Sequence, residues 1–175
     1  MELTQEYLKQ CLDYNPDTGV FTWKIRPLSH FNSKQGCNRT NSQFAGTELK
    51  KIDDHGYIRP MINGKHIRAH RLAWLYVYGV MPENQIDHVN CIRSDNRIVN
   101  LREATPAQNN QNKKKPCKNN MNGSLGVSFY KRQGLFVARI KDKGKSYFLG
   151  YFNTEKEASD AYISAKRQLH EYGTL

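Results

Sequence analysis

The sequence of 175 residues lacks features that mark whole classes of proteins. It has no run of about 18 apolar residues, which is the length that a helix needs to cross a bilayer. Its first residues, Met1 to Thr4, lack the basic and apolar segments of a secretion signal. We therefore expect a cytoplasmic protein with no membrane partner.

Cysteines are few and widely spaced. The four are Cys11, Cys37, Cys91 and Cys117, and no two of them form a Cys-x-x-Cys pair. Structural zinc sites usually draw on such close pairs. The sequence therefore predicts no structural zinc, and free thiols in a reducing compartment.

Acidic residues are scarce beside basic ones, with 16 Asp and Glu against 27 Lys and Arg, which gives a formal net charge of +11. This balance favours a polyanionic partner, because each phosphate that a basic side chain neutralises releases counterions. A basic protein without such a partner is the alternative. Binding to duplex DNA should weaken steeply with salt, with a slope of roughly −0.9 per phosphate contacted.

Local signals indicate short elements in the first part of the chain. Thr4 is placed to begin a helix, with Leu3 and Leu8 as a hydrophobic staple and Leu12 at the end of its apolar stripe. Residues 15–19 have strong turn chemistry and precede a strand at residues 20–23. Residues 27–43 are polar and without pattern, which indicates a surface loop.

The middle of the chain alternates strand and helix signals. Asn63-Gly64 predicts a hairpin between residues 57–62 and 65–70, followed by a helix at residues 71–78 that ends at Gly79. Residues 86–101 indicate two short strands joined by a loop. Thr105, Pro106 and Gln108 then form a capping box, which places Asn109 in the first turn of the next helix.

The last part of the chain predicts a small independent module. Residues 110–124 are polar and basic, so that their lysines either track a phosphate backbone or belong to a solvated tether. Three strands are expected at residues 126–130, 135–141 and 146–152. A helix capped by Thr154 and Glu157 follows and should end at Gly173.

Asp87, His88, Asn100 and Asn109 combine the groups that a one-metal phosphodiesterase needs. A neutral histidine accepts a proton from water at pH 7, which suits His88 as general base. Mg²⁺ needs one or two protein oxygen ligands, and Asp87 with the amide oxygen of Asn109 supplies them. Asn100 would orient the imidazole.

Neighbouring residues in a regular strand point to opposite faces. Asp87 and His88 should therefore lie at a strand end or a bulge, where both can face one pocket. Asp95-Asn96-Arg97 is expected to brace the connecting loop, and Arg97 to reach a phosphate.

Residues 1–112 resemble the HNH homing endonucleases of phages and mobile introns. The resemblance implies a ββα-metal (His-Me finger) fold with one Mg²⁺ or Mn²⁺, held by Asp87 and Asn109, with His88 as base and Asn100 orienting it. One departure is Cys91, where such sequences commonly have glycine, so that a positive φ there would strain the loop. The matching strings are Thr18-Gly19-Val20-Phe21-Thr22-Trp23, Gly56-Tyr57-Ile58-Arg59, His70-Arg71-Leu72-Ala73-Trp74, Ile86-Asp87-His88-Val89-Asn90, Asp95-Asn96-Arg97, Asn100-Leu101-Arg102 and Asn109.

Residues 124–173 resemble the DNA-binding domain of the plant Apetala type (AP2). The resemblance rests on the segments 126–128, 136–140, 148–152 and 154–158. Strand parity places Ala138 and Ile140 toward the helix and Arg139 and Lys141 on the opposite face. This chain has fewer arginines and tryptophans than plant members, so base readout would be weaker or different, and a protein-binding module is the alternative. The implied DNA-facing set is Ser128, Tyr130, Arg132, Arg139, Lys141 and Phe148.

The sequence thus predicts an α+β protein: a nuclease domain at residues 1–112, a basic linker at 113–123, and a three-stranded antiparallel sheet on one helix at 124–175. The expected function is metal-dependent, homing-type cleavage or nicking of double-stranded DNA by a monomer, in the host cytoplasm if the source is a phage. A DNA-binding regulator that does not cleave is the alternative, and RNA is a third possible substrate.

Overall fold

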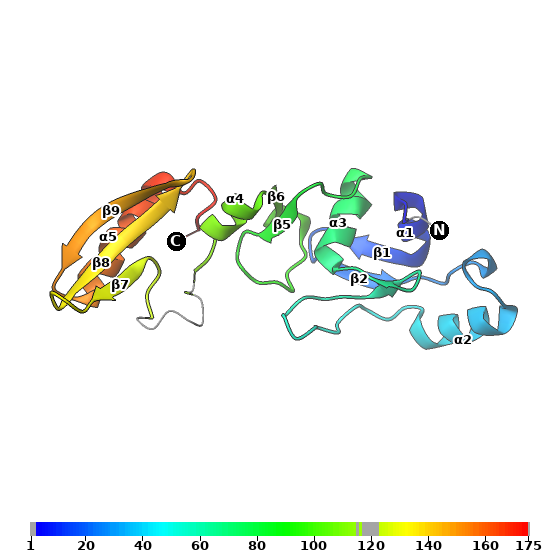
Figure 1. The fold of residues 1–175 in the computed structure, drawn as a ribbon. Helices are drawn as coiled ribbons and strands as arrows, with labels where there is room; N and C mark the ends of the chain where they lie inside the picture. The colour runs from blue at the N-terminus through cyan, green and yellow to red at the C-terminus, as the bar shows by residue number, and fades with distance from the viewer. Residues whose placement is uncertain (1–2, 115, 117–122, 175) are drawn as a thin grey trace. The chain divides into compact units, whose positions relative to one another are not determined.

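The computed structural model describes residues 3–114, 116 and 123–174. The chain forms two compact units, Met1–Glu103 and Ala104–Leu175 (Figure 1). Helices and small antiparallel sheets are mixed, as in an α+β fold. Most of the predicted linker, including Cys117, lies outside the described residues. No helix among the described residues is long and apolar enough to cross a membrane.

The first unit begins with helix α1 (Gln5–Cys11), where Thr4 caps the helix as predicted by accepting from the amide of Tyr7. The chain leaves the helix at Leu12, whose backbone is extended, and enters a hairpin of β1 (Leu12–Asn15) and β2 (Val20–Trp23). The predicted strand at residues 20–23 is confirmed. Its partner was not predicted, because buried Leu12 continues the apolar spacing of the preceding helix.

The turn of this hairpin packs closely on the loop at residues 96–97. Gly19 has a φ of +73°, and a Cβ there would lie 2.4 Å from the amide nitrogen of Arg97 and 2.6 Å from the carbonyl carbon of Asn96. The amide of Ile98 donates to the carbonyl of Pro16 at 3.0 Å. Glycine at this position therefore lets the hairpin support the loop.

We expect Gly19→Ala to lower the free energy of unfolding by at least about 2 kcal/mol, because it adds a backbone clash to the cost of a positive φ. The melting temperature should fall by roughly 8 °C or more. Gly46→Ala is the matched control, since Gly46 has a φ of +77° and a Cβ there would meet no described atom within 4 Å. Equal losses in thermal denaturation of the two variants would show that the close approach is unimportant.

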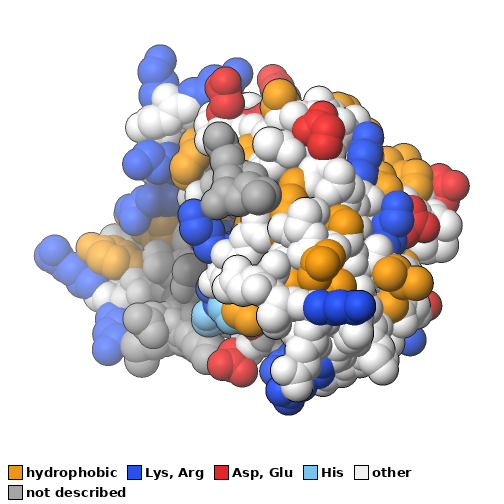
Figure 2. Space-filling view, turned by 90° about the vertical axis from the view of Figure 1, so that its right-hand side faces the viewer, with side chains coloured by type: hydrophobic (Ala, Val, Ile, Leu, Met, Phe, Trp, Pro, Cys, Tyr) orange, Lys and Arg blue, Asp and Glu red, His pale blue; other side chains and the backbone are white. Residues whose placement is uncertain are grey.

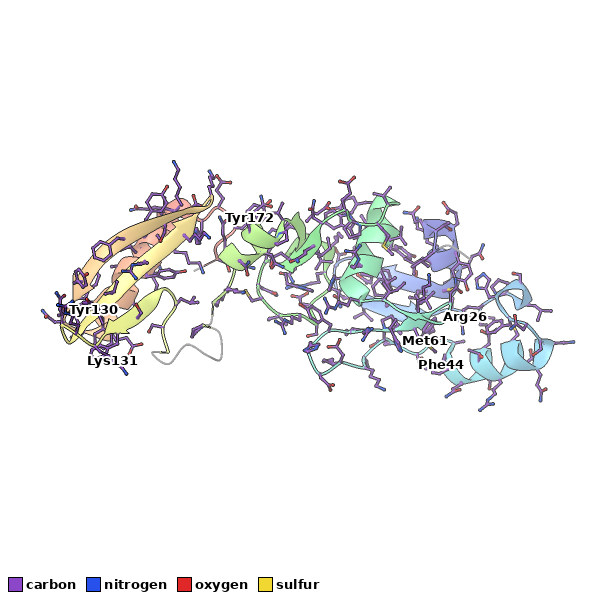
Figure 3. All side chains as sticks on the ribbon, in the orientation of Figure 1. Arg26, Phe44, Met61, Tyr130, Lys131 and Tyr172 are labelled. Atoms are coloured by element: carbon purple, nitrogen blue, oxygen red, sulfur yellow. The ribbon has the colours of Figure 1, made fainter. Side chains whose placement is uncertain are left out.

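The surface loop predicted for residues 27–43 is wrong. The segment contains a 3-10 turn, η1 (Leu28–His30), and helix α2 (Lys34–Phe44). Ser33 caps α2 by accepting from the amide of Gly36, and the carboxamide of Asn41 bonds both the amide and the carbonyl of Arg26, at 3.0 and 2.9 Å. Figure 3 labels Arg26 and Phe44 in this region. Cys37 is the one buried residue of α2, so no apolar period revealed the helix.

The predicted Asn63-Gly64 hairpin is confirmed but is shorter than expected, with β3 (Met61–Ile62) and β4 (Lys65–His66). Helix α3 (Ala69–Tyr78) begins two residues early and ends at Gly79, whose left-handed backbone caps it as predicted. The two helices α1 and α3 and the first hairpin enclose the core of this unit. Its fully buried side chains include Leu8, Cys11, Leu12, Phe21, Ile62, Leu72 and Ala73.

The two strands predicted within residues 86–101 pair as β5 (Gln85–His88) and β6 (Leu101–Ala104), with a 3-10 turn, η2 (Ile98–Asn100), before the second. β6 begins where the prediction ended, because Asn100 closes the turn. Helix α4 (Pro106–Gln111) follows β6 in the chain. The predicted capping box of Thr105 and Gln108 is confirmed, with Pro106 in the first turn.

The second unit contains the predicted three-stranded antiparallel sheet, β7 (Val127–Tyr130), β8 (Leu135–Asp142) and β9 (Lys145–Phe152). Helix α5 (Glu155–Leu169) packs on one face of it (Figure 1). The capping box of Thr154 and Glu157 is confirmed. The predicted helix end at Gly173 is wrong, because His170 leaves the helical backbone and places its Nε2 3.0 Å from the carbonyl oxygen of Lys141.

Residues 111–113 also belong to the second unit, although the sequence placed them at the end of the nuclease domain and the start of a linker. The Gln111 amide donates to the carboxylate of Asp142 at 3.0 Å, and the buried Lys166 ammonium donates to the carbonyl of Lys113 at 2.5 Å. Asn112 is buried and accepts from the hydroxyl of Thr174. The boundary of the compact units falls between Glu103 and Ala104, because these contacts tie α4 to the C-terminal module.

Candidate active site

Asp87 and His88 are the last two residues of β5, and each residue is only 5% exposed. The predicted strand end is therefore confirmed. The chain turns directly after His88, since the amide of Cys91 donates to the carbonyl of His88 at 2.8 Å. The amide of Val89 donates to the carbonyl of Asn100 at 2.9 Å, which ties this turn to the start of β6.

Cys91 has a φ of +65°, so the loop takes the left-handed conformation that was expected to strain a cysteine. A residue with a side chain in this conformation costs about 1–3 kcal/mol. The side chain of Cys91 is exposed and forms no disulfide within the described residues, so this cost arises from the backbone. The hydrogen bonds of the surrounding loop hold the conformation in place.

Two rings pack near the imidazole of His88. The ring centroid of His70 is 5.0 Å away, nearly perpendicular, and that of Tyr57 is 6.0 Å away. Burial lowers the pKa of His88 below its ordinary value, while a hydrogen bond with Asn96 and the charge of Asp87 oppose this shift. The imidazole is therefore neutral at pH 7 and able to accept a proton.

His70, in the first turn of α3, is 4% exposed, and burial lowers its pKa to about 3. Its ring packs against Tyr57 at 5.2 Å as well as against His88. Its Nδ1 has no hydrogen-bond partner among the described residues. His70 thus stays uncharged and forms part of the wall that desolvates His88.

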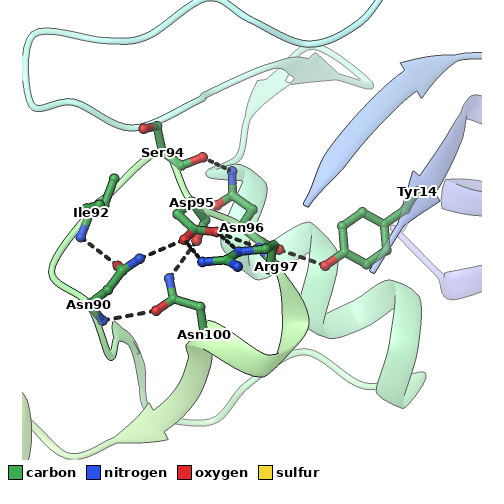
Figure 4. A network of polar contacts seen from close by, with 8 residues as sticks. All are labelled: Tyr14, Asn90, Ile92, Ser94, Asp95, Asn96, Arg97 and Asn100. Carbon is green, nitrogen blue, oxygen red and sulfur yellow. Dashed lines mark hydrogen bonds and ion pairs between the residues drawn. The ribbon is translucent and has the colours of Figure 1, made fainter. Parts of the chain in front are cut away.

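The predicted role of Asn100 in orienting the imidazole directly is wrong. Its Nδ2 donates to the carbonyl of Asp95 at 2.9 Å, and its Oδ1 accepts from the amide of Asn90 at 3.0 Å (Figure 4). Both ends of the carboxamide therefore hold the loop between β5 and η2. Another asparagine of this loop, Asn96, bonds His88 instead.

Asn96 is buried, and both its side chain and its backbone form hydrogen bonds. It is 1% exposed, its Nδ2 donates to the carbonyl of Ser94 at 3.2 Å, and its own carbonyl accepts from the hydroxyl of Tyr14 at 2.7 Å (Figure 4). From the sequence, Asn96 was expected only to brace the loop. Its backbone is held by Tyr14, which is far away in the sequence, and no local signal distinguished Asn96 from Asn100.

Arg97 braces the loop, as expected, through a side-on pair with the carboxylate of Asp95. Its Nε and one terminal nitrogen donate at 2.9 and 2.6 Å, and this pairing lowers the pKa of Asp95. Asp95 also accepts from the carboxamide of Asn90 at 2.6 Å. The side chain of Arg97 is 46% exposed, so the guanidinium also borders solvent. Its contact with phosphate stays a prediction.

Asp87 pairs with Arg102 of β6, which was not among the predicted site residues. Its Oδ2 accepts from two guanidinium nitrogens of Arg102 at 2.9 and 2.8 Å. A buried carboxylate is costly without a countercharge, and Arg102 supplies one here. Cross-strand pairing of β5 with β6 brings the two together, and only a strand alignment could have revealed this.

The donor chemistry around Asp87 suits one hard divalent ion. A carboxylate oxygen is a ligand that Mg²⁺ and Mn²⁺ prefer, and Mg²⁺ requires few protein donors. Among the described residues, no group of three or more His, Cys, Asp or Glu side chains is placed to hold a metal ion. Asn109 lies in α4, which belongs to the second unit, so its role as a ligand stays a prediction.

In the second unit, the strands bring five of the six predicted DNA-facing residues onto one face of the sheet. The strand register places Ser128, Tyr130, Arg139, Lys141 and Phe148 on the face opposite α5, and all five are exposed. Ala138 and Ile140 are buried on the other face, as parity predicted. Arg132 is exposed in the β7–β8 turn, where Figure 3 labels Tyr130 and Lys131.

Aromatic rings cover part of this free face. Tyr151, which was not among the predicted residues, lies 6.1 Å from Tyr130 and 5.1 Å from Phe148 between ring centroids. The guanidinium carbon of Arg139 is 5.8 Å from the Phe148 ring. Val137 lies opposite Tyr151 and is buried although it faces away from α5, so the rings shield the middle of the sheet.

Comparison with known proteins locates the nuclease features within one segment. Residues 68–111 match the family model described as HNH endonuclease. Neither the curated proteins nor the solved structures give a match. The matched segment contains Asp87, His88, Asn96, Asn100 and Asn109, so residues 68–111 are an HNH endonuclease-type domain, which supports a nuclease, a phosphodiester hydrolase.

Proposed function

We propose that the protein is a metal-dependent, site-directed DNA endonuclease with His88 as general base. The observation that carries this proposal is the pairing of a buried, neutral imidazole with a buried carboxylate at the end of β5, inside the HNH segment. A neutral imidazole at this depth accepts a proton at pH 7 without first losing one.

The residues of the chain divide the hydrolysis as follows. His88 takes a proton from water, whose oxygen forms a bond to phosphorus as the bond from phosphorus to the leaving oxygen breaks. The leaving oxygen takes the electron pair of that bond and is then protonated from solvent. Asn96 holds the imidazole, and Asn100 holds the loop that carries Asn96.

Asp87, together with the amide oxygen of Asn109, would hold one Mg²⁺ or Mn²⁺. Such an ion neutralises charge on the phosphate and on the leaving oxygen. Asp87 offers a carboxylate oxygen, the kind of ligand that these ions prefer, although its Oδ2 is paired with Arg102.

The second unit would supply affinity and register on the same duplex, in the manner of an AP2-type domain. Its free sheet face combines Arg139 and Lys141, which suit phosphates, with exposed rings that suit base or sugar contacts. Two units joined in one chain give the second contact a high effective concentration. This arrangement supports the homing-type specificity that the sequence resemblance implied.

We expect the double substitution Arg139→Gln and Lys141→Gln to weaken duplex binding and to reduce its salt slope by roughly 1.8, which corresponds to two phosphate contacts. Fluorescence anisotropy across a salt series measures this. The control removes two charges from α5 with Lys156→Gln and Arg167→Gln, which are exposed on the opposite side of the sheet. If both double variants lose the same affinity and slope, the sheet face is not the DNA surface.

Conversion of supercoiled plasmid to nicked or linear form in Mg²⁺, with an EDTA control, tests the function itself. Binding of duplex DNA without conversion, under all divalent ions tried, would favour a regulator that retains the nuclease fold. Competition between duplex DNA and structured RNA at fixed salt tests the substrate class. Preference for the RNA competitor would overturn the DNA assignment.

A further inference from the structure

A basic hollow of about 550 Å³ lies in the first unit, outside the catalytic residues named above. Three arginines and two histidines line it, with Ile67 and Met81 as its apolar wall, and no carboxylate is among its described lining residues. The basic side chains are His55, Arg59, His66, Arg68 and Arg71. Figure 2 shows Lys and Arg side chains scattered over one face of the molecule, among uncharged side chains and some Asp and Glu.

Arg59 and Arg71 of the hollow form no ion pair with a described residue. In the part of the chain that the structure describes, the exposed Arg59 has no hydrogen bond or ion pair. Arg71 is fixed by donating to the carbonyls of Asn84 and Pro82, at 3.2 and 3.0 Å, and so keeps its full charge. The nearby carboxylate of Asp53 accepts from the amides of His55 and Tyr57, both at 2.9 Å, and its charge interacts with Arg68, so it offsets part of the positive charge of the hollow.

Tyr57 connects this hollow to the candidate active site. The guanidinium carbon of Arg68 lies 4.2 Å from the centre of the Tyr57 ring. The same ring lies 5.2 Å from His70 and 6.0 Å from His88. One aromatic side chain therefore separates the arginines of the hollow from the general base.

We infer that the hollow binds the phosphate backbone of the DNA strand that His88 cleaves, within a few nucleotides of the cleaved bond. The inference rests on the proposed function and adds a second contact surface to it. Guanidinium groups donate in a fork that matches phosphate oxygens, which suits Arg59 and Arg68, while Arg71 contributes its positive charge. Such contacts position the strand and do not read its sequence.

The test uses two variants. The first is the double substitution Arg59→Gln with Arg68→Gln. The second is Arg59→Gln alone, which leaves the contact between Arg68 and the Tyr57 ring in place. The double variant should raise KM for nicking more than it lowers kcat, and reduce the salt slope of binding by roughly 1.8. The loss should be the same for matched and unrelated duplexes. Lys9→Gln with Lys24→Gln removes equal charge from exposed residues that do not line the hollow, and should leave KM and slope unchanged.

Phosphate-ethylation interference then locates the contact. Ethyl groups that block wild-type binding but no longer affect the double variant should lie next to the nicked bond. Released positions about one helical turn of 10 base pairs or more away would overturn the inference, as would a slope and KM equal to those of the control. If the wild-type chain fails to nick any duplex, the proposed function fails instead, and the two failures are thereby distinguished.

Discussion

We expect His88→Ala to lower the nicking rate by about 10²–10⁴-fold, the range typical of a lost general base. Duplex affinity should stay within about twofold, because the imidazole is buried among rings and carries no charge that would attract a phosphate. Plasmid nicking at saturating protein measures the rate, and anisotropy with a labelled duplex measures the affinity. A large loss of nicking rate with an unchanged affinity would identify His88 as a residue that acts in cleavage and not in DNA binding.

His30→Ala is a suitable control for this substitution. His30 belongs to the same unit, lies in η1, and stacks on Tyr7, far in the sequence from β5. Its variant should nick at the wild-type rate. His88→Gln should nick as slowly as His88→Ala, although glutamine fills more of the space that the imidazole occupies. A rate restored by His88→Gln would show that the loss in His88→Ala came from packing alone. Wild-type nicking by either His88 variant would show that another group removes the proton.

The second large effect concerns Asp87. We expect Asp87→Asn to lower nicking by at least about 10²-fold at fixed Mg²⁺ and to raise the metal concentration that gives half-maximal rate by at least about tenfold. The reason is that the amide replaces a charged oxygen ligand by a neutral one. Changes to residues that only support a metal ligand already lower metal affinity or activity by about 10–100-fold, so loss of the ligand itself should cost at least as much. Nicking rates over a titration of Mg²⁺ and of Mn²⁺ measure both quantities, and EDTA should abolish activity.

Arg102→Gln separates the metal role of Asp87 from its ion pair. Both variants lose the contacts of 2.8 and 2.9 Å between the carboxylate and the guanidinium, but only Asp87→Asn loses the carboxylate. Arg102→Gln should therefore not raise the metal requirement. If the two variants show the same rise, Asp87 acts through the structure of the β5–β6 pair and does not hold the ion.

Local signals predicted the elements whose ends are marked by hydrogen-bonding side chains. Thr105 with Gln108 and Thr154 with Glu157 form the expected capping boxes, and Gly79 has the expected left-handed backbone. Helix α2 escaped prediction because its stability comes from Asn41, which bonds the distant backbone of Arg26, and from a single buried cysteine. A helix without an apolar stripe offers periodicity analysis nothing to detect.

The candidate site divides in the same way. Asp87 and His88 are adjacent in the chain, so their placement at one strand end followed from the sequence and from the requirement that both face one pocket. The residue that bonds His88 could not be chosen locally, because Asn96 and Asn100 are alike in chemistry and lie in one short loop. The hydroxyl of Tyr14 holds the backbone carbonyl of Asn96, and this contact joins residues that are 82 positions apart in the sequence.

The sequence by itself determined the identity of the reactive groups, the positive charge of the chain, and the caps and turns that place these groups at element ends. These properties depend on residue chemistry and on contacts within a few positions. Only the tertiary structure decided that Arg102 neutralises Asp87, that Asn100 supports the loop, and that the arginines beside Tyr57 surround one hollow. Each of these contacts joins segments that fold against one another, and their distances are set by core packing that no local pattern records.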